Sequence, residues 1–272
     1  MKSGLSLLLL NLLSAAFYIG VVIAAMKVIC VIFGKGKTPG PVKIKRNETI
    51  TITKEQYIKV ILLTAGIWIS IIGVSYLCTV YKKNSIISLS DFLNIFTTRW
   101  DSNSFREIAA KGYQIGTDRD VLMVFLPFYP LLIRAFSYIF GNVETSSIII
   151  SLFCAVGSVI YLYKLMRVDY DEETSFRAVK YYLLFPTAFF LLTPMSESIF
   201  MLLVLAAFYY IRRHKWSVAS VIAFAASFTR LQGCLLMFPM IVEMFLELDE
   251  KGGGKVKDKL LGVLKKSYYI VL

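Results

Sequence analysis

Charged side chains are scarce in this sequence. Asp, Glu, Lys and Arg make up 18% of the 272 residues, compared with roughly 25% in an average soluble domain. Hydrophobic residues make up 57% and form several runs that are long enough to cross a bilayer as helices. The composition therefore excludes an ordinary soluble domain and predicts an all-α, multi-pass integral membrane protein.

The sequence also has few of the residues that build metal sites and nucleophilic triads. Its single histidine, His214, lies in a basic turn, and its four cysteines lie in apolar runs without CxxC spacing: Cys30, Cys78, Cys154 and Cys234. This pattern argues against a disulfide framework and against a zinc site. Without a histidine cluster or a Ser-His-Asp triad, catalysis would have to rest on carboxylates.

The net charge is nevertheless strongly positive, at +12. The Lys and Arg residues cluster between the apolar runs, as expected for loops that remain on the cytoplasmic side of a membrane. A nucleic-acid function would need a solvated basic surface interleaved with exposed aromatic residues, and no such stretch is visible. The positive charge therefore predicts membrane topology and no nucleic-acid partner.

Runs of apolar and basic residues divide the chain into five parts. They are an additional N-terminal transmembrane helix (residues 1–33), a basic cytoplasmic loop (34–56), a transmembrane core (57–250), a basic cytoplasmic linker (251–266) and the start of a truncated further helix (267–272). The first helix of the core, residues 57–81, would carry the chain outward. An amphipathic stretch at 88–96 and a polar loop at 114–120 then follow on the extracytoplasmic side.

The topology of the remaining chain depends on residues 122–140, which are apolar but contain two prolines and Arg134. If this segment crosses the membrane, the basic turn at 212–215 and the Lys-rich stretch after Leu248 both fall outside. If it lies along the membrane as an interfacial or re-entrant segment, both fall inside, as the distribution of basic loops favours. We therefore predict that it does not cross.

The later segments then alternate in direction. We predict an inward crossing at 148–166, a cytoplasmic stretch of mixed charge at 167–180, an outward crossing at 181–193, an inward one at 199–211, an outward one at 217–228 and an inward one at 234–248. This order brings Asp101, Glu197 and Arg230, from three separate segments, to the outer membrane face. Their convergence predicts a functional site, because ionisable groups next to the hydrocarbon region usually have a function.

Asp101 lies in the polar island Arg99-Trp100-Asp101-Ser102. A positioned carboxylate can act as the general base that removes a proton from an attacking hydroxyl group, and the neighbouring side chains of Arg99, Trp100 and Ser102 could bind a sugar. An alternative is that Asp101 only forms an ion pair with Arg99 or Arg106.

Four further residues are candidates for substrate binding: Glu197, Arg230, Gln232 and Arg134. Arg230 could bind a lipid-linked phosphate through paired hydrogen bonds, or it could pair with Glu197 or reach lipid headgroups. Glu197 could bind sugar hydroxyls, or it could favour the start of its helix through the helix dipole. Gln232 could orient the substrate, whereas Arg134 could bind the phosphate or anchor its helix at the interface. No metal site is predicted, although a divalent cation with several waters could use Asp101 and Glu197.

Four motifs resemble one known family in order and spacing, over residues 91–243. They are Arg99-Trp100-Asp101 with Phe105, Ile108-Ala109 and Gly112-Tyr113; Phe125-Leu126-Pro127-Phe128-Tyr129-Pro130-Leu131; Ser196-Glu197-Ser198; and Thr229-Arg230-Leu231-Gln232-Gly233. This set resembles the PIG-V family, which contains the second mannosyltransferase of glycosylphosphatidylinositol assembly and its prokaryotic relatives.

The resemblance implies a GT-C glycosyltransferase fold with interfacial helices in the first extracytoplasmic loop. It implies an inverting mannosyltransferase that moves a sugar from a polyprenyl-phosphate donor to a lipid-linked or cell-surface glycan acceptor, with Asp101 as general base and Glu197 in the second outer turn. It also favours the plasma membrane of a prokaryote over the endoplasmic reticulum membrane.

Three features depart from the family pattern. Ser104 stands where the family often has histidine, the first apolar helix and its loop precede the usual start, and the remaining C-terminal helices of the family are absent from this sequence. The departures leave two alternatives to an enzyme open: a lipid or glycolipid transporter, and a non-catalytic membrane subunit.

Overall fold

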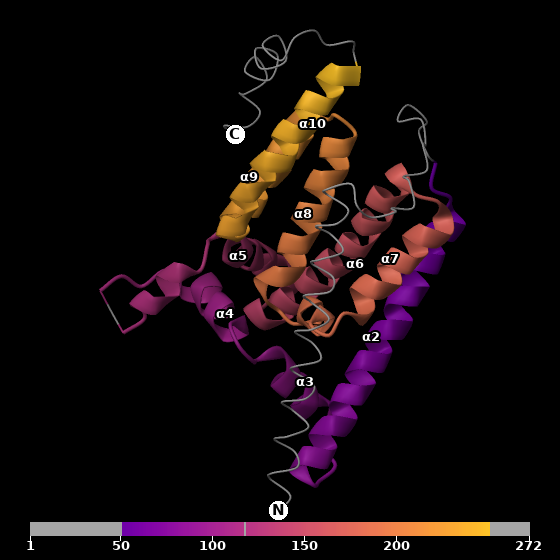
Figure 1. The fold of residues 1–272 in the computed structure, drawn as a ribbon. Coiled ribbons are helices and arrows are strands. Elements are labelled where there is room, and N and C mark those ends of the chain that lie inside the picture. Colours follow the sequence, from indigo (N-terminus) through magenta and orange to yellow (C-terminus); the bar gives the residue numbers. More distant parts are fainter. Residues whose placement is uncertain (1–50, 117, 251–272) are drawn as a thin grey trace, which may run out of the picture. The chain divides into compact units, whose positions relative to one another are not determined.

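A computed structural model describes residues 51–116 and 118–250, and it contains only helices and connecting segments within those ranges (Figure 1). The helices are α2 (Lys54–Lys83), α3 (Leu89–Thr97), α4 (Ser102–Lys111), η1 (Asp120–Val124), α5 (Phe128–Phe140), α6 (Val143–Asp169), α7 (Glu172–Leu184), η2 (Ala188–Leu192), α8 (Ser196–Arg212), α9 (Trp216–Thr229), η3 (Leu231–Leu236) and α10 (Met237–Glu250). The prediction of an all-α chain is confirmed for these residues. The predicted parts at 1–33, 251–266 and 267–272, and most of the loop at 34–56, lie outside them.

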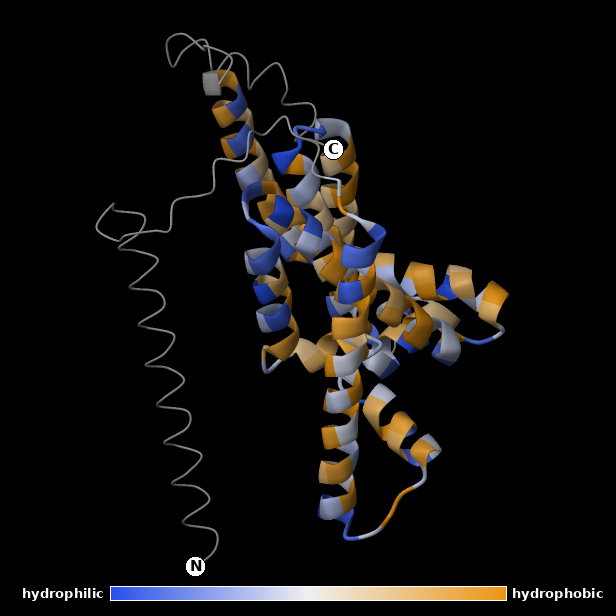
Figure 2. Ribbon diagram, turned by 90° about the vertical axis from the view of Figure 1, so that its right-hand side faces the viewer, coloured by the Kyte–Doolittle hydropathy of each residue, from blue (hydrophilic) through white to orange (hydrophobic). Residues whose placement is uncertain are grey.

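Within residues 51–116 and 118–250, three helical stretches are long and apolar enough to cross a membrane: Lys54–Lys83, Val143–Asp169 and Leu231–Leu248. A crossing helix needs roughly 20 predominantly apolar residues. Hydrophobic residues accordingly dominate the long helices, while hydrophilic residues gather mainly at helix ends and in connections (Figure 2). The first crossing begins earlier than its apolar pattern predicts, because the Thr53 and Gln56 side chains form a reciprocal cap that starts α2 at Lys54.

The segment at 122–140 is divided in two, rather than forming one continuous element. Pro127 separates the short helix η1 from α5. The 13 residues of α5 extend only about 20 Å, less than the roughly 30 Å of a hydrocarbon core. Figure 1 shows α5 almost end-on while α2 and α8 run lengthwise. Its length agrees with a non-spanning segment, and its position in a membrane stays a prediction.

The mixed-charge stretch at 167–180 is mostly helical, and its predicted position on the cytoplasmic side stays a prediction. Only Tyr170 and Asp171 connect α6 to α7, which starts at Glu172 and extends beyond Lys180 to Leu184. The Asp171 side chain accepts a hydrogen bond from the Thr174 backbone N–H at 2.7 Å and so caps the helix. The charged residues of this stretch therefore belong to the first turns of α7, and the segment predicted as a crossing at 181–193 is the end of α7 followed by η2.

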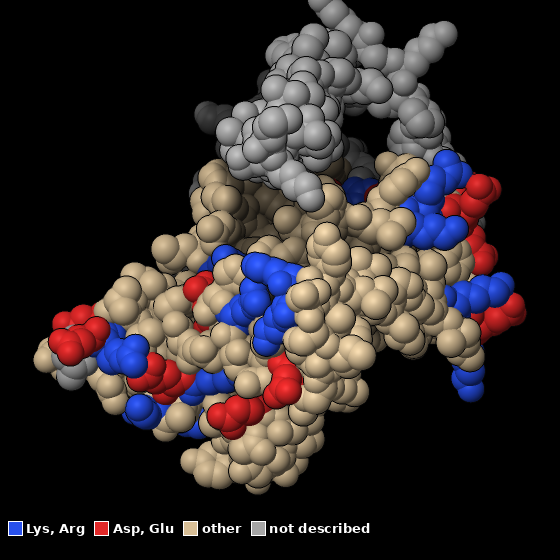
Figure 3. Space-filling view, turned by 90° about the horizontal axis from the view of Figure 1, so that it is seen from below, with Lys and Arg blue, Asp and Glu red and all other residues tan. Residues whose placement is uncertain are grey.

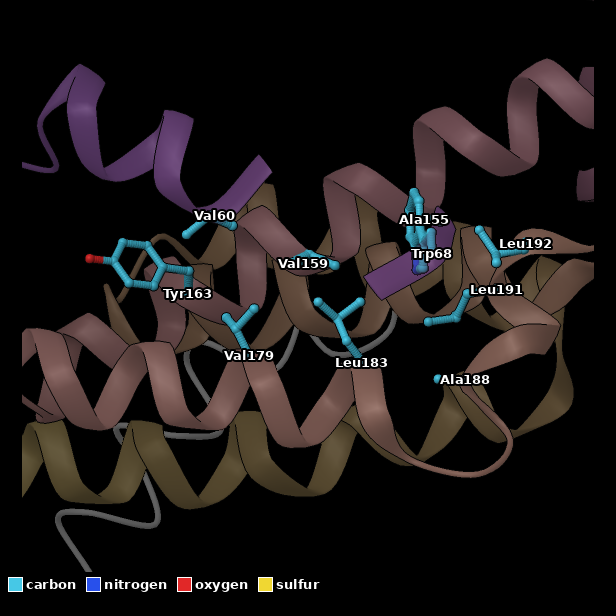
Figure 4. Packing of buried hydrophobic residues seen from close by; sticks show 10 residues of the cluster. All are labelled: Val60, Trp68, Ala155, Val159, Tyr163, Val179, Leu183, Ala188, Leu191 and Leu192. Carbon is cyan, nitrogen blue, oxygen red and sulfur yellow. The ribbon is translucent and has the colours of Figure 1, made fainter. Parts of the chain in front are cut away.

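The largest core cluster joins α2, α6, α7 and η2 through buried side chains (Figure 4). Val60, Val159, Tyr163, Val179 and Leu183 are each at most 1% exposed. A second cluster joins α4, α5, α6 and α8. This second cluster carries the polar island of Asp101, because it holds α4 against the long helices.

Candidate functional site

The Asp101 carboxylate lies at the N-terminal end of α4. Asp101 is the N-cap residue, but its side chain makes no capping hydrogen bond, and it forms no ion pair or hydrogen bond with the residues that the structure describes. The alternative of an ion pair with Arg99 or Arg106 is therefore not realised.

Helix α4 is fixed by contacts on its buried face. The Phe105 ring lies 4.9 Å from that of Phe125 and 5.1 Å from that of Tyr129. Arg106 is 7% exposed, and its Nε donates a hydrogen bond of 2.9 Å to Ser147 Oγ on α6. Burial lowers the pKa of the Arg106 guanidinium. These contacts make α4 a rigid support that holds Asp101 at its exposed end.

A second charged group joins α8 to the segment after α9. Arg230 Nη1 donates a hydrogen bond of 2.7 Å to Glu197 Oε1 in the first turn of α8. The other Glu197 oxygen, Oε2, is buried without a hydrogen-bond partner among the described residues. The predicted pairing of Arg230 with Glu197 is therefore present, and it leaves one carboxylate oxygen unsatisfied.

Gly233 determines where Arg230 lies. A Cβ atom at this position would lie 2.3 Å from Ser227 N and 2.4 Å from Ala226 C. Only glycine therefore allows η3 to pack this closely on α9. The tight turn projects Arg230 and Gln232 toward the end of α4.

Asp101 and Arg230 line the same cavity, which has a volume of about 250 Å³. Its other lining residues are Phe105, Val124, Phe125, Leu126, Ser196, Thr229, Leu231 and Gln232. Seen from the end of the helices at which α3 and α4 lie, acidic and basic side chains form groups within a largely uncharged surface (Figure 3). The volume is below the roughly 300–1,000 Å³ of typical ligand pockets, so this cavity suits one sugar ring or one phosphate.

Four of the eight predicted site residues come together here. Asp101, Arg230 and Gln232 line the cavity, and Glu197 contacts it through Arg230. Two others, Arg99 and Trp100, are exposed in the connection before α4. The Trp100 ring lies 5.7 Å from that of Phe189 and 5.1 Å from that of Phe190.

The last two predicted residues, Ser102 and Arg134, do not line this cavity. Ser102 is fully buried, and its hydroxyl has no hydrogen-bond partner among the described residues. Arg134 Nε donates a hydrogen bond of 2.6 Å to the Ala109 carbonyl oxygen and so ties α5 to α4. The described residues contain no group of three or more His, Cys, Asp or Glu side chains that could hold a metal ion.

Sequence reasoning missed the apolar wall of the cavity. Phe105, Phe125 and Leu126 belong to the two aromatic motifs, yet their pattern is equally typical of core packing or of an interfacial belt. Ser196 and Thr229 flank Glu197 and Arg230 directly. Because Ser196 and Thr229 are adjacent to charged residues at helix ends, the sequence could have indicated that they line the cavity.

Comparison with known proteins relates the chain to a family of membrane enzymes. No curated protein and no solved structure matches the chain, but the family model described as dolichyl-phosphate-mannose-protein mannosyltransferase matches residues 126–264. The matched region includes Glu197 and Arg230, whereas Asp101 precedes it. The match covers just over half of the chain, which therefore belongs to this mannosyltransferase-like family of GT-C membrane glycosyltransferases.

Proposed function

We propose that the chain is a multi-pass mannosyltransferase that transfers a sugar from a polyprenyl-phosphate donor to a glycan acceptor. The observation that carries this proposal is the single cavity lined by Asp101 and Arg230, with Glu197 paired to Arg230 beside it. It combines an unpaired carboxylate with a cation, and transfer from a sugar phosphate needs both.

Arg230 binds the donor phosphate in this mechanism. Only its Nη1 is hydrogen-bonded to Glu197, so the remaining donors of its planar guanidinium can bind phosphate oxygens through paired hydrogen bonds. The Arg230 side chain is 36% exposed, and a lipid phosphate could therefore reach it. Glu197 holds the guanidinium in place through this hydrogen bond.

Asp101 acts as the general base. The acceptor hydroxyl oxygen attacks the anomeric carbon, its proton passes to the Asp101 carboxylate, and the bond between the anomeric carbon and the phosphate oxygen breaks. The electron pair of that bond leaves with the polyprenyl phosphate, whose charge Arg230 stabilises. One carboxylate is sufficient for a single displacement, which inverts the configuration at the anomeric carbon.

The proposed topology puts this site on the extracytoplasmic side. The α3–α5 region follows the first crossing and would lie at the interface, because its helices are too short to span. The acceptor is a lipid-linked or cell-surface glycan, as in the PIG-V-type resemblance, and a prokaryotic plasma membrane is the favoured location. The family description names a protein acceptor instead, so the two acceptor classes need a direct comparison.

The test is the formation of a covalent product. The full-length protein in liposomes is given polyprenyl phosphate carrying radiolabelled mannose, together with either a glycolipid or a peptide acceptor. The proposal expects labelled glycolipid with inverted anomeric configuration. Labelled peptide would contradict the glycan acceptor, and label that crosses the vesicle membrane without a new glycosidic bond would identify a transporter.

A further inference from the structure

A groove between α2 and α7 lies away from the candidate site. The two helices begin side by side, because Gln56 Nε2 on α2 donates a hydrogen bond of 2.7 Å to Glu172 Oε2 on α7 (Figure 1). From that end they run in the same direction. Two successive cavities, of about 580 and 450 Å³, lie between them.

The first cavity is lined by charged side chains at the starting ends of both helices. The lining residues are Lys59, Leu63, Glu172, Glu173, Phe176, Arg177 and Lys180. Lys59 pairs with Glu55, and Arg177 pairs with Glu173, each at 2.9 Å. Among the described residues Lys180 has no ion-pair partner. With Glu55 counted, three carboxylates balance the three cations, and Lys180 is the cation at this end that can pair with a negatively charged group of a ligand.

The second cavity continues along the same helices and is largely apolar. Its α2 wall runs from Gly66 to Ser75, and its α7 side is formed by Leu183, Leu184 and the residues that follow. From Leu63 in the first cavity to Ser75 in the second, the groove extends about 18 Å along α2. One leaflet of a hydrocarbon core is about 15 Å thick. The groove thus has a charged end and an apolar arm with the depth of one leaflet.

We infer that this groove binds an anionic membrane phospholipid, with its phosphate at Lys180 and Arg177 and one acyl chain along Gly66 and Ile71. Basic pockets between membrane helices are known to bind anionic headgroups. Glu172 and Glu173 accept hydrogen bonds from hydroxyl groups of a glycerol or inositol headgroup. This site is independent of the proposed sugar transfer, and its ligand is a constituent of the membrane rather than a donor or an acceptor.

Two glycines of α2 allow a matched test. Neither Gly66 nor Gly73 has an atom within 4 Å of an added Cβ, so a leucine can be introduced at either position without an initial clash. Gly66 lines the apolar cavity, whereas Gly73 lines neither cavity. Both substitutions raise helix propensity by a similar amount. Gly66→Leu therefore fills the groove, and Gly73→Leu controls for the added side chain.

The experiment counts bound lipids by native mass spectrometry of delipidated full-length protein, titrated with phosphatidylglycerol or phosphatidylcholine. The wild type is expected to retain phosphatidylglycerol at least about tenfold more tightly, as a hydrogen bond to a charged group implies. Lys180→Ala removes this preference, and Gly66→Leu removes the binding. Gly73→Leu retains both, as does Lys83→Ala at the other end of α2.

Three results would overturn the inference. Equal retention of the two lipids would show that the headgroup charge does not contribute to binding. Unchanged phosphatidylglycerol binding in Gly66→Leu would show that the lipid does not occupy the groove. A higher KM for the donor in Gly66→Leu, with unchanged phosphatidylglycerol binding, would assign the groove to the donor's prenyl chain. Thermal unfolding of the two leucine variants shows that each is folded.

Discussion

The two ends of α8 carry the same kind of ion pair in different settings. Near its start, Glu197 pairs with Arg230. Among the described residues, neither Glu197 Oε2 nor the Asp101 carboxylate beside the cavity has a partner. At its end, about 22 Å away, Arg212 donates hydrogen bonds of 3.0 and 3.2 Å to the two oxygens of Glu243 and also pairs with Asp169.

The difference shows which charged cluster is available for chemistry. The cluster at the end of α8 joins α6, α8 and α10, and Glu243 in it is only 5% exposed. Arg212 already bonds to two carboxylates, so the cluster stabilises helix packing but has few free hydrogen-bond donors for a ligand. The cluster at the start of α8 keeps free hydrogen-bonding capacity next to a cavity. Four predictions test this contrast.

Asp101→Asn should have the largest effect. The amide keeps the size of the side chain but cannot accept the proton, so kcat for mannose transfer should fall by about 10²- to 10⁴-fold, with unchanged thermal stability. Asp118→Asn is the matched control, because Asp118 is exposed in the same region but does not line the cavity. Transfer at the wild-type rate by Asp101→Asn would refute the general-base role.

Arg230→Gln tests the phosphate contact. Loss of charged hydrogen bonds worth about 1.5–3 kcal/mol should raise the donor KM roughly 10- to 100-fold. Arg230→Lys should recover part of this loss, because it keeps the charge but not the paired geometry. Initial rates over a range of donor concentrations give the KM. An unchanged KM would show that Arg230 does not bind the donor phosphate and only pairs with Glu197.

Arg212→Gln perturbs the saturated cluster. Removing one partner of a buried ion pair costs about 3–5 kcal/mol, but the Arg212 and Asp169 side chains are 23% and 30% exposed. Solvent screening reduces the expected loss of unfolding free energy to about 1–3 kcal/mol. Unfolding followed by circular dichroism in detergent would measure it.

The same variant should transfer mannose at the wild-type rate per folded molecule. Arg213→Gln is its control, because no ion pair of Arg213 is found among the described residues. A loss of transfer in Arg212→Gln without a loss of stability would contradict the division between a structural and a functional cluster.

Counting apolar segments and basic loops along the sequence predicts one common end of the helices for Asp101, Glu197 and Arg230. Hydropathy determines where helices are long enough to cross, so the relative ends of successive segments were predictable. Which side of the membrane this end faces stays a prediction. The contact of Arg230 with Glu197 was only one of several alternatives, since the sequence gives no distances between segments.

The direction of individual side chains in the short helices could not be predicted. Ser102 is adjacent to Asp101 but fully buried. Arg134 does not line the cavity, and its Nε donates a hydrogen bond to the Ala109 carbonyl oxygen instead. Both orientations depend on how α4 and α5 pack on α6. The mixed charge of residues 167–180 gave no sign of the helix α7, which exposes charged side chains on one face while burying Val179 on another.

The smallest expected effect concerns two aromatic residues with left-handed backbones: Trp100, in the connection before α4, and His214, just after α8. Both have φ of +52°, an uncommon conformation for residues with a side chain. The Trp100 ring contacts those of Phe189 and Phe190, whereas His214 stacks on Trp216 at 5.3 Å and its Nε2 lies 3.3 Å from Glu243 Oε1. Glycine adopts this conformation readily, so neither Trp100→Gly nor His214→Gly forces the turn to change. Each variant loses a ring contact worth about 0.5–1.5 kcal/mol, and His214→Gly also loses the contact with Glu243. Trp100→Gly should therefore lower transfer by less than about tenfold at nearly constant stability, whereas His214→Gly should lower only the unfolding free energy. If His214→Gly slowed transfer as much as Trp100→Gly at equal stability, the two ends of α8 would have to act as one connected unit.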